Sequence, residues 1–505
     1  MTFANTILAL LDLEVFLYML LGIVLGMILG ALPGFTGSMG IALLIPITYT
    51  MEPVPALVML MAIYTSGIYG GSISAILLHT PGAPSSAATA DDGYALTVQG
   101  KGLQALGVST VCSCLGGFIS GLALICIAPW LANICLYFGP AEKFMVAIFG
   151  LTIIGSLCSG GVIKGLLAGA LGLAISCIGV DAQTGYPRFM YGNDYLAGGL
   201  ATIPVLIGLF SLSQVFLMSE THTGSNKAIV DKALNELHGR TLPPLREMMG
   251  LIIPTIRSAI IGVGVGIMPG AGGDIASFLA VNIGKQSSKH PEEYGKGSME
   301  AVACSETANN AVSGGAMIPL LTLSIPGAAT AALLLGGFTM HGLVPGSELF
   351  TTQADIVYPI LSGFTFSNIV MGIIGLIAAR YVARVVSIPM SILAPVIMVM
   401  ATLGCYSVNL SFLDVWSMVI FGMIGYIMVK HQMVTSPIVL AIILGPIAEQ
   451  SLLQSLTLAR STPILAYYAS RPIVLVMVAL SIFSILWTVM REKKISKKAK
   501  EAQSA

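Results

Sequence analysis

Four proline–glycine pairs lie in apolar parts of the sequence, and they are well suited to bind a solute through the backbone. Proline cannot donate a backbone hydrogen bond and clashes with the preceding turn, so each pair should interrupt a helix. The following glycine lets a ligand approach the backbone closely. Such a break within a membrane is costly unless it is buried in protein or lines an aqueous cavity. The pairs are Pro33-Gly34, Pro81-Gly82, Pro269-Gly270 and Pro326-Gly327.

Two kinds of ligand suit these breaks. A helix N-terminus at a break carries partial positive charge, so free amides facing a shared pocket could hold an anion. The predicted substrate-binding residues are Pro33, Gly34, Thr36, Gly37, Ser38, Thr80, Pro81, Gly82, Pro269, Gly270, Gly272, Gly273, Pro326 and Gly327. Amide and carboxylate oxygens suit a coupling cation, either Na⁺ or a proton. The predicted coupling-ion residues are Asp274, Glu306, Asn309 and Asn310.

The breaks recur in the same order in two halves of the chain. Residues 26–37 read GMILGALPGFTG and residues 262–273 read GVGVGIMPGAGG, and both fit G-x3-G-x2-P-G-x2-G. Gly70-Gly71 precedes the second break of the first half, as Gly314-Gly315 does in the second half. We therefore predict an internal duplication. The alternative is that each pair only ends a helix at the membrane surface, which fits a single pair better than a duplicated set.

The composition indicates what kind of element must position the breaks. Of 505 residues, 56% are hydrophobic and 9% are charged, with a mean hydropathy of +0.91. Soluble proteins carry about 25% charged residues, so most of this surface must face lipid. Solid apolar runs favour helices over a β-barrel. We predict an all-α polytopic membrane protein of about 10–13 spanning segments, in two repeats with broken helices or re-entrant hairpins.

The polar stretches of the sequence predict its organisation. We expect a first transmembrane repeat at 1–218, a polar mid-chain loop at 219–246, a second repeat with C-terminal helices at 247–490, and a basic tail at 491–505. Within the second repeat, one apolar segment is expected at 311–335, after a polar stretch from Lys285 to Glu300. The basic tail predicts a cytoplasmic C-terminus.

Other chemistry finds little support in the residue pattern. The eight cysteines show no disulfide or zinc spacing, and the six histidines show no HExxH or other metal spacing. No nucleophile with an adjacent base is evident, so an enzyme is not predicted, and neither a metal nor another cofactor is expected. The net charge of zero gives no indication of a nucleic-acid partner.

Several segments resemble the large membrane subunit, TctA, of the tripartite tricarboxylate transporter family. The first half carries GALPGFTGSMGIALLIPITY at 30–49 and YGGSISAILLHTPGAPSSAATADDGY at 69–94. The second half carries MPGAGGDIASFLA at 268–280, ETANNAVSGGAMIPLLTLSIPGAATAALLLG at 306–336 and GLVPGSELF at 342–350. One departure is His79, where members of the family often carry asparagine.

The resemblance implies a secondary importer of small organic carboxylates in a bacterial inner membrane. It further implies a TctB-like small membrane subunit, a TctC-like periplasmic receptor and an ion gradient in place of ATP. No arginine or lysine lies within 30–94 or 262–280, so helix N-termini and hydroxyls are expected to hold the carboxylates. An elevator-like slide of a substrate-holding domain is our hypothesis for the motion. The alternatives are another ion-coupled carrier or a channel and, less favoured, an intramembrane enzyme.

Overall fold

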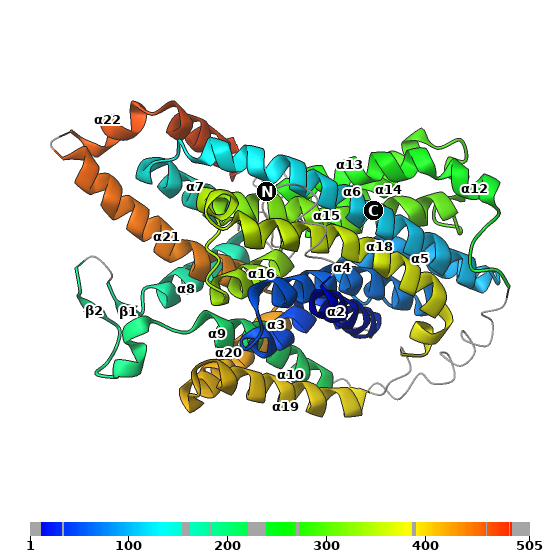
Figure 1. Ribbon diagram of the computed structural model, residues 1–505, viewed down its shortest axis with the longest axis horizontal. Helices are drawn as coiled ribbons and strands as arrows, with labels where there is room; N and C mark the ends of the chain where they lie inside the picture. Colours follow the sequence, from blue (N-terminus) through cyan, green and yellow to red (C-terminus); the bar gives the residue numbers. More distant parts are fainter. Residues whose placement is uncertain are drawn as a thin grey trace, which may run out of the picture.

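The computed structural model describes residues 12–32, 35–153, 162–181, 184–220, 239–268, 272–385, 390–460, 462–483 and 485–486. These residues form helices, except for connecting segments and one two-stranded hairpin. The prediction of an all-α polytopic membrane protein is confirmed (Figure 1).

Each half of the chain begins with a similar series of four helices, with short additional helices between or before them. The first series is α2 (Leu13–Ala31), α3 (Gly37–Thr48), α4 (Pro53–Leu78), η1 (Pro84–Ser86) and α5 (Ala87–Val98). The second series is α12 (Leu245–Gly250), α13 (Ile252–Ile267), α14 (Gly272–Ser287), η5 (Pro291–Glu293), α15 (Met299–Leu323) and α16 (Ala329–Met340). Helices α2, α3, α4 and α5 correspond in order to α13, α14, α15 and α16, and the second helix of each set packs against the third.

Each series is also followed by a long helix and further helices. After the first come α6 (Gly102–Cys135), α7 (Pro140–Ile153), α8 (Val162–Ser176), β1 (Gly179–Val180), β2 (Pro187–Arg188), η3 (Asp194–Gly198), α9 (Thr202–Ile207), the π-helical turn η4 (Gly208–Leu212) and α10 (Ser213–Glu220). After the second come α17 (Ser347–Thr351), α18 (Ala354–Val385), α19 (Met390–Asn409), α20 (Phe412–Lys430), α21 (Ser436–Ala459), α22 (Ile464–Ala469) and a helix at Pro472–Phe483.

The two series run in opposite directions. The Tyr69 hydroxyl of α4 lies 2.8 Å from the Thr110 hydroxyl of α6, whereas Ile76, later in α4, accepts a hydrogen bond from Thr97, just before α6 begins. Helices α4 and α6 are therefore antiparallel. Contacts along α6 and α15 advance together, because Gly116 abuts Thr307 and Ser120 abuts Gly314. Since α15 is parallel to α6, α4 and α15 are antiparallel, and the series are inverted.

Small residues hold the first and third helices of each series together. A Cβ atom added to Gly22 of α2 would lie 2.5 Å from the carbonyl oxygen of Met59 in α4. A Cβ atom on Gly262 of α13 would lie equally close to the carbonyl oxygen of Ala308 in α15. This backbone-to-backbone packing is typical of membrane helices, which gain little from burying apolar surface against each other in lipid.

Two groups of helices flank this core, which consists of α2–α6, α13–α16 and α18. In the first lateral group, α21 packs on α7 and α8. In the second lateral group, α20 packs on α9, η4 and α10, and α19 joins it. Phe35 and Met39, at the start of α3, bury their side chains among Ile207, Val215 and Met418 of the second group.

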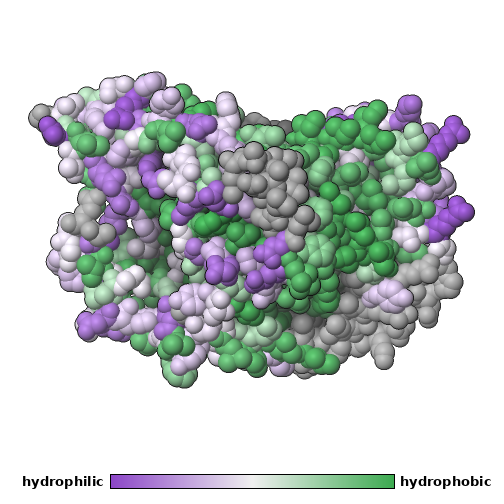
Figure 2. Space-filling view, viewed as in Figure 1, coloured by the Kyte–Doolittle hydropathy of each residue, from purple (hydrophilic) through white to green (hydrophobic). Residues whose placement is uncertain are grey.

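The described apolar helices fall into two groups by length. Six are individually long and apolar enough to cross a bilayer: Leu13–Ala31, Pro53–Leu78, Gly102–Cys135, Ala354–Ala379, Phe412–Lys430 and Ser436–Ala459. Much of the remaining apolar sequence among the described residues forms helices of 10–17 residues. Figure 2 shows a broad hydrophobic surface over the right half of the view, while hydrophilic residues gather at the left end and the right edge.

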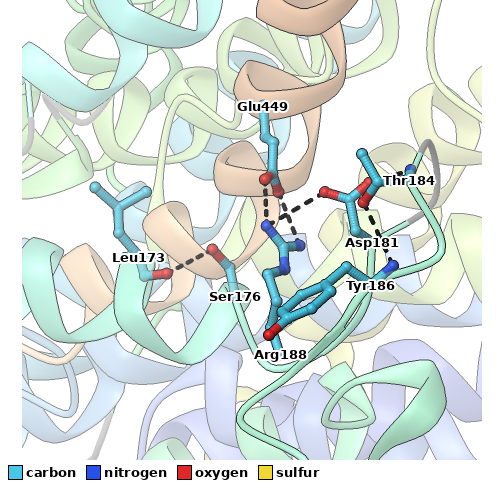
Figure 3. A network of polar contacts seen from close by, with 7 residues as sticks. All are labelled: Leu173, Ser176, Asp181, Thr184, Tyr186, Arg188 and Glu449. Atoms are coloured by element: carbon cyan, nitrogen blue, oxygen red, sulfur yellow. Dashed lines mark hydrogen bonds and ion pairs between the residues drawn. The ribbon is translucent and has the colours of Figure 1, made fainter.

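The segment between α8 and α9 is anchored to both lateral groups. Its hairpin pairs Gly179 with Arg188 and Val180 with Pro187. Arg188 forms a two-point ion pair with Glu449 of α21, and its guanidinium also lies 3.6 Å from Asp181 (Figure 3). Further along, the Tyr195 hydroxyl donates to Asp414 at the start of α20. The segment therefore links α21 to α20.

We expect Glu449→Gln to lower the thermal midpoint of the purified protein. The variant removes the charge from a two-point pair whose side chains are 25% and 37% exposed, which should cost about 1 kcal/mol. Differential scanning fluorimetry in detergent measures the change. The control is Glu220→Gln, which removes the partner of Lys430 in a more exposed pair and should shift the midpoint less. Equal shifts for the two variants would contradict this expectation.

Candidate functional site

In each series the second break packs against the end of the helix that precedes the first break. A Cβ atom on Gly82, in the second break of the first series, would lie 2.6 Å from the carbonyl oxygen of Gly30, just before the first break. Gly327 is packed in the same way against the carbonyl oxygen of Gly266. Pro33, Gly34, Pro269 and Gly270 themselves lie outside the described residues.

The second breaks share one backbone geometry. Helix α4 ends before His79 and α15 ends before Ser324, and both of these residues adopt a left-handed conformation, with φ of 54° and 59°. The chain then folds back along its own helix. The Gly82 amide donates to the Gly71 carbonyl at 3.1 Å, and the Gly327 amide donates to the Ala316 carbonyl at 3.4 Å.

These hydrogen bonds correct one expectation drawn from the sequence. The amides of Gly82 and Gly327 are not free to face a ligand, because a buried amide without water needs a partner and finds one in the preceding helix. Pro326 is buried, Pro81 is half-buried and Thr80 is exposed, with its hydroxyl donating to the Leu78 carbonyl. The second breaks thus serve to reverse the chain and start η1, α5 and α16.

The second break of the first series meets the start of α14 in the second series. Gly272, with φ of 65°, begins α14, and Gly273 follows in its first turn. A Cβ atom on Gly273 would lie 2.5 Å from Oδ1 of Asn309 and 3.1 Å from Cβ of Ser85. Segments from opposite halves of the chain therefore converge over the middle of α15, where the first-turn amides of α14 have no partner within their own helix.

The side chains of Asn309 and Asn310 are the most unusual groups at this junction. Asn309 is 1% exposed and Asn310 is 0% exposed. None of their side-chain oxygen or nitrogen atoms has a hydrogen-bond partner among the described residues. Burying an amide without a hydrogen bond costs roughly 1–3 kcal/mol on the scale of protein mutations. Such groups in a native fold call for a ligand or water as partner.

Glu306, one turn earlier in α15, has the opposite environment. Its Oε1 accepts hydrogen bonds from Ser72 at 2.7 Å and Thr89 at 2.5 Å. Its Oε2 accepts from Ser109 at 3.1 Å and Ser113 at 3.0 Å. The carboxylate is completely buried, and the four hydroxyls fill its acceptor positions.

The first series has no equivalent amide pair. Matching Gly70 with Gly315 aligns Tyr64 and Thr65 of α4 with Asn309 and Asn310. At the start of α3, the Thr36 and Ser38 hydroxyls bond to each other at 2.8 Å. Gly37 packs on Gly67 at ordinary contact distance. The polar side chains of the two halves therefore differ, although their backbones correspond.

Asp274 lies on the exposed side of the first turn of α14. An acid at this position stabilises the positive end of the helix. The sequence-based selection omitted Ser85 and Asn368. The Oδ1 atom of Asn368 is also buried without a partner among the described residues. Ser85 could have been indicated by its polarity close to Pro81-Gly82, whereas Asn368 belongs to α18 and no local signal pointed to it. In the described residues, no group of three or more His, Cys, Asp or Glu side chains could hold a metal ion.

A multi-pass helical membrane protein whose broken segments converge on unpaired polar groups has the architecture of a solute transporter. Residues 16–440 match the tripartite tricarboxylate transporter TctA family, and the chain belongs to this family. The resemblance found in the sequence is thereby confirmed.

Two proteins from Agrobacterium vitis are similar in sequence to this chain. One, described as an uncharacterized 52.8 kDa protein in the TAR-I ttuC' 3' region, is 35% identical over 439 residues, which cover 87% of this chain and 86% of the relative. The other, described as an uncharacterized protein in the TAR-II ttuC' 3' region, is 34% identical over 196 residues, covering 39% of this chain and 81% of the relative. No solved structure matches the chain significantly.

We expect Gly327→Ala to destabilise the core. Its Cβ atom would lie 2.7 Å from Cα of Ala316 and would also meet the Gly266 carbonyl oxygen, so the backbone must shift, at a cost of about 1–3 kcal/mol. Thermal unfolding in detergent measures the effect. Gly264→Ala, on an exposed face of α13 with nothing near the new Cβ, is the matched control and should be neutral or slightly stabilising. A Gly327→Ala protein as stable as the control would contradict the close packing of the two breaks.

Proposed function

We propose that this chain is a secondary active importer of small organic carboxylates of the tricarboxylate or dicarboxylate class, driven by a cation gradient. The proposal assigns it a receptor that delivers the substrate and a small membrane subunit as partners. Membership of the TctA family supports the substrate class and the partners. The observation that carries the site is the unpaired amide of Asn309, buried where segments of both series meet.

The chemistry of the junction fits an anion and a cation together. The first-turn amides of α14 and the Asn309 amide nitrogen would donate to a carboxylate. The oxygens of Asn309, Asn310 and Thr307 would coordinate a cation, and Asp274 would add negative charge at the first turn of α14. Because an amide oxygen does not carry a proton at neutral pH, these ligands favour Na⁺ over H⁺. No cationic side chain is needed to hold the substrate.

The inverted series support alternating access. Two halves of opposite direction can exchange equivalent arrangements, so the site opens to either side in turn. The core packs against both lateral groups, through α3 on α19 and α16 on α21, which supports an elevator-like slide of the core against them. The glycine contacts would keep α2 with α4 and α13 with α15 during that motion.

Charge placement supports an orientation in the membrane. Lys101, Arg240 and Lys296 lie at one end of the core, where Gln99 bonds to the Lys296 carbonyl and Thr241 packs on Gly107. By the positive-inside rule this end faces the cytoplasm of a bacterial inner membrane, as does the basic tail, which lies outside the described residues. The hairpin and α22, at the left of Figure 1, would then face the receptor.

Asn309→Ala tests the proposal. Proteoliposomes holding the chain, its small subunit and its receptor are assayed for uptake of citrate and other carboxylates under imposed Na⁺ or H⁺ gradients. The variant should lower kcat/KM at least tenfold, since it removes one hydrogen bond to the substrate and one oxygen ligand of the cation. Asn282→Ala, exposed on α14, should transport like the parent.

Parent-like uptake by a correctly inserted Asn309→Ala protein would place the site elsewhere. Uptake that does not saturate, or that needs neither a gradient nor the receptor, would favour a channel.

A further inference from the structure

Glu306 joins the two halves of the core through a single carboxylate. Glu306 belongs to α15 in the second half, whereas its four hydrogen-bond donors belong to the first half. They come from three helices: Ser72 from α4, Thr89 from α5, and Ser109 and Ser113 from α6. The carboxylate forms no ion pair in the part of the chain that the structure describes.

This arrangement fits an ionised carboxylate. An ionised carboxylate only accepts hydrogen bonds and has about four acceptor positions, and here four hydroxyls occupy them. A proton on either oxygen would turn one of the four donors away. Hydrogen bonds to a charged acceptor are also stronger than those between neutral groups, which offsets part of the cost of burial.

An ionised Glu306 leaves a negative charge beside the unpaired amides. Asn309 and Asn310 follow it by three and four residues on the same helix, and residues at this spacing are neighbours, with Cβ atoms about 5–6 Å apart. The carboxylate oxygens are already occupied by hydroxyls, so they are unavailable as direct ligands. The amide oxygens are the free ligands, and the charge lies just behind them.

We propose that Glu306 is the fixed counter-charge for a cation that Asn309 and Asn310 bind, a positioning residue of the ion site that is not itself a ligand. The inference rests on the proposed function and deepens it. Removing the charge should weaken cation binding while leaving the amide ligands in place. Removing one hydroxyl leaves the charge with three donors, so it should lower stability much more than cation affinity.

The test is Na⁺-dependent stabilisation of the purified, full-length chain. The thermal midpoint is followed as NaCl replaces choline chloride at constant ionic strength, because a ligand that binds only the folded state raises the midpoint. Glu306→Gln should raise the Na⁺ concentration for half-maximal stabilisation at least tenfold. Ser109→Ala should lower the midpoint in choline chloride but keep the Na⁺ concentration within twofold of the parent.

A second variant keeps the test decisive if Glu306→Gln does not fold. Asn310→Asp retains an oxygen ligand and adds negative charge, so the half-maximal Na⁺ concentration should fall at least threefold. Unchanged Na⁺ dependence in Glu306→Gln or Asn310→Asp overturns the inference, as does a shift in Ser109→Ala as large as that in Glu306→Gln. A parent without any Na⁺ response overturns it too, whereas carboxylate uptake, measured separately, decides the proposed function.

Discussion

The close approach of backbones at glycine is the contact on which the core depends. Gly22, Gly26 and Gly30 bring α2 against α4 so closely that a Cβ atom would clash with a carbonyl group of α4 or the Ser66 side chain, and Gly262 and Gly266 do the same for α13 and α15. In lipid, tight packing replaces the hydrophobic drive that holds helices together in water. The same contacts fix the flanks of each first break, so Gly82 and Gly327 find their places against Gly30 and Gly266.

Upon this shared backbone, the two halves have diverged in their polar side chains. Tyr64 occupies in α4 the position that Asn309 occupies in α15, and Met61 corresponds to Glu306. One half therefore contributes the buried charge and the unpaired amides, and the other half contributes the hydroxyls that bind the charge. The Glu306 carboxylate depends on the other half, because without those hydroxyls it would be buried with no hydrogen-bond donors.

Local signals in the sequence predicted the membrane helices, the four breaks and the polar residues of α15, since apolar runs and Pro-Gly pairs act over a few residues. The sequence did not predict α3, α5 and α14 as separate helices, and it joined α16 to the segment before it. One segment expected at 311–335 is in fact the end of α15 and the start of α16, because the polar residues 299–310 are helical inside protein. The donors of Glu306 lie 193–234 residues away in sequence, and the inversion of the halves depends on spatial contacts, so neither could be read locally.

The segment between α8 and α9 connects the two lateral groups at one end of the molecule. Its Arg188 pairs with Glu449 of α21, and its Tyr195 donates a hydrogen bond to Asp414 of α20. The two ends of the segment continue into α8 and α9. The two lateral groups are thus joined through this segment on one side of the molecule. Moving α21 away from α20 at this end would therefore require breaking the Arg188–Glu449 ion pair or the Tyr195–Asp414 hydrogen bond.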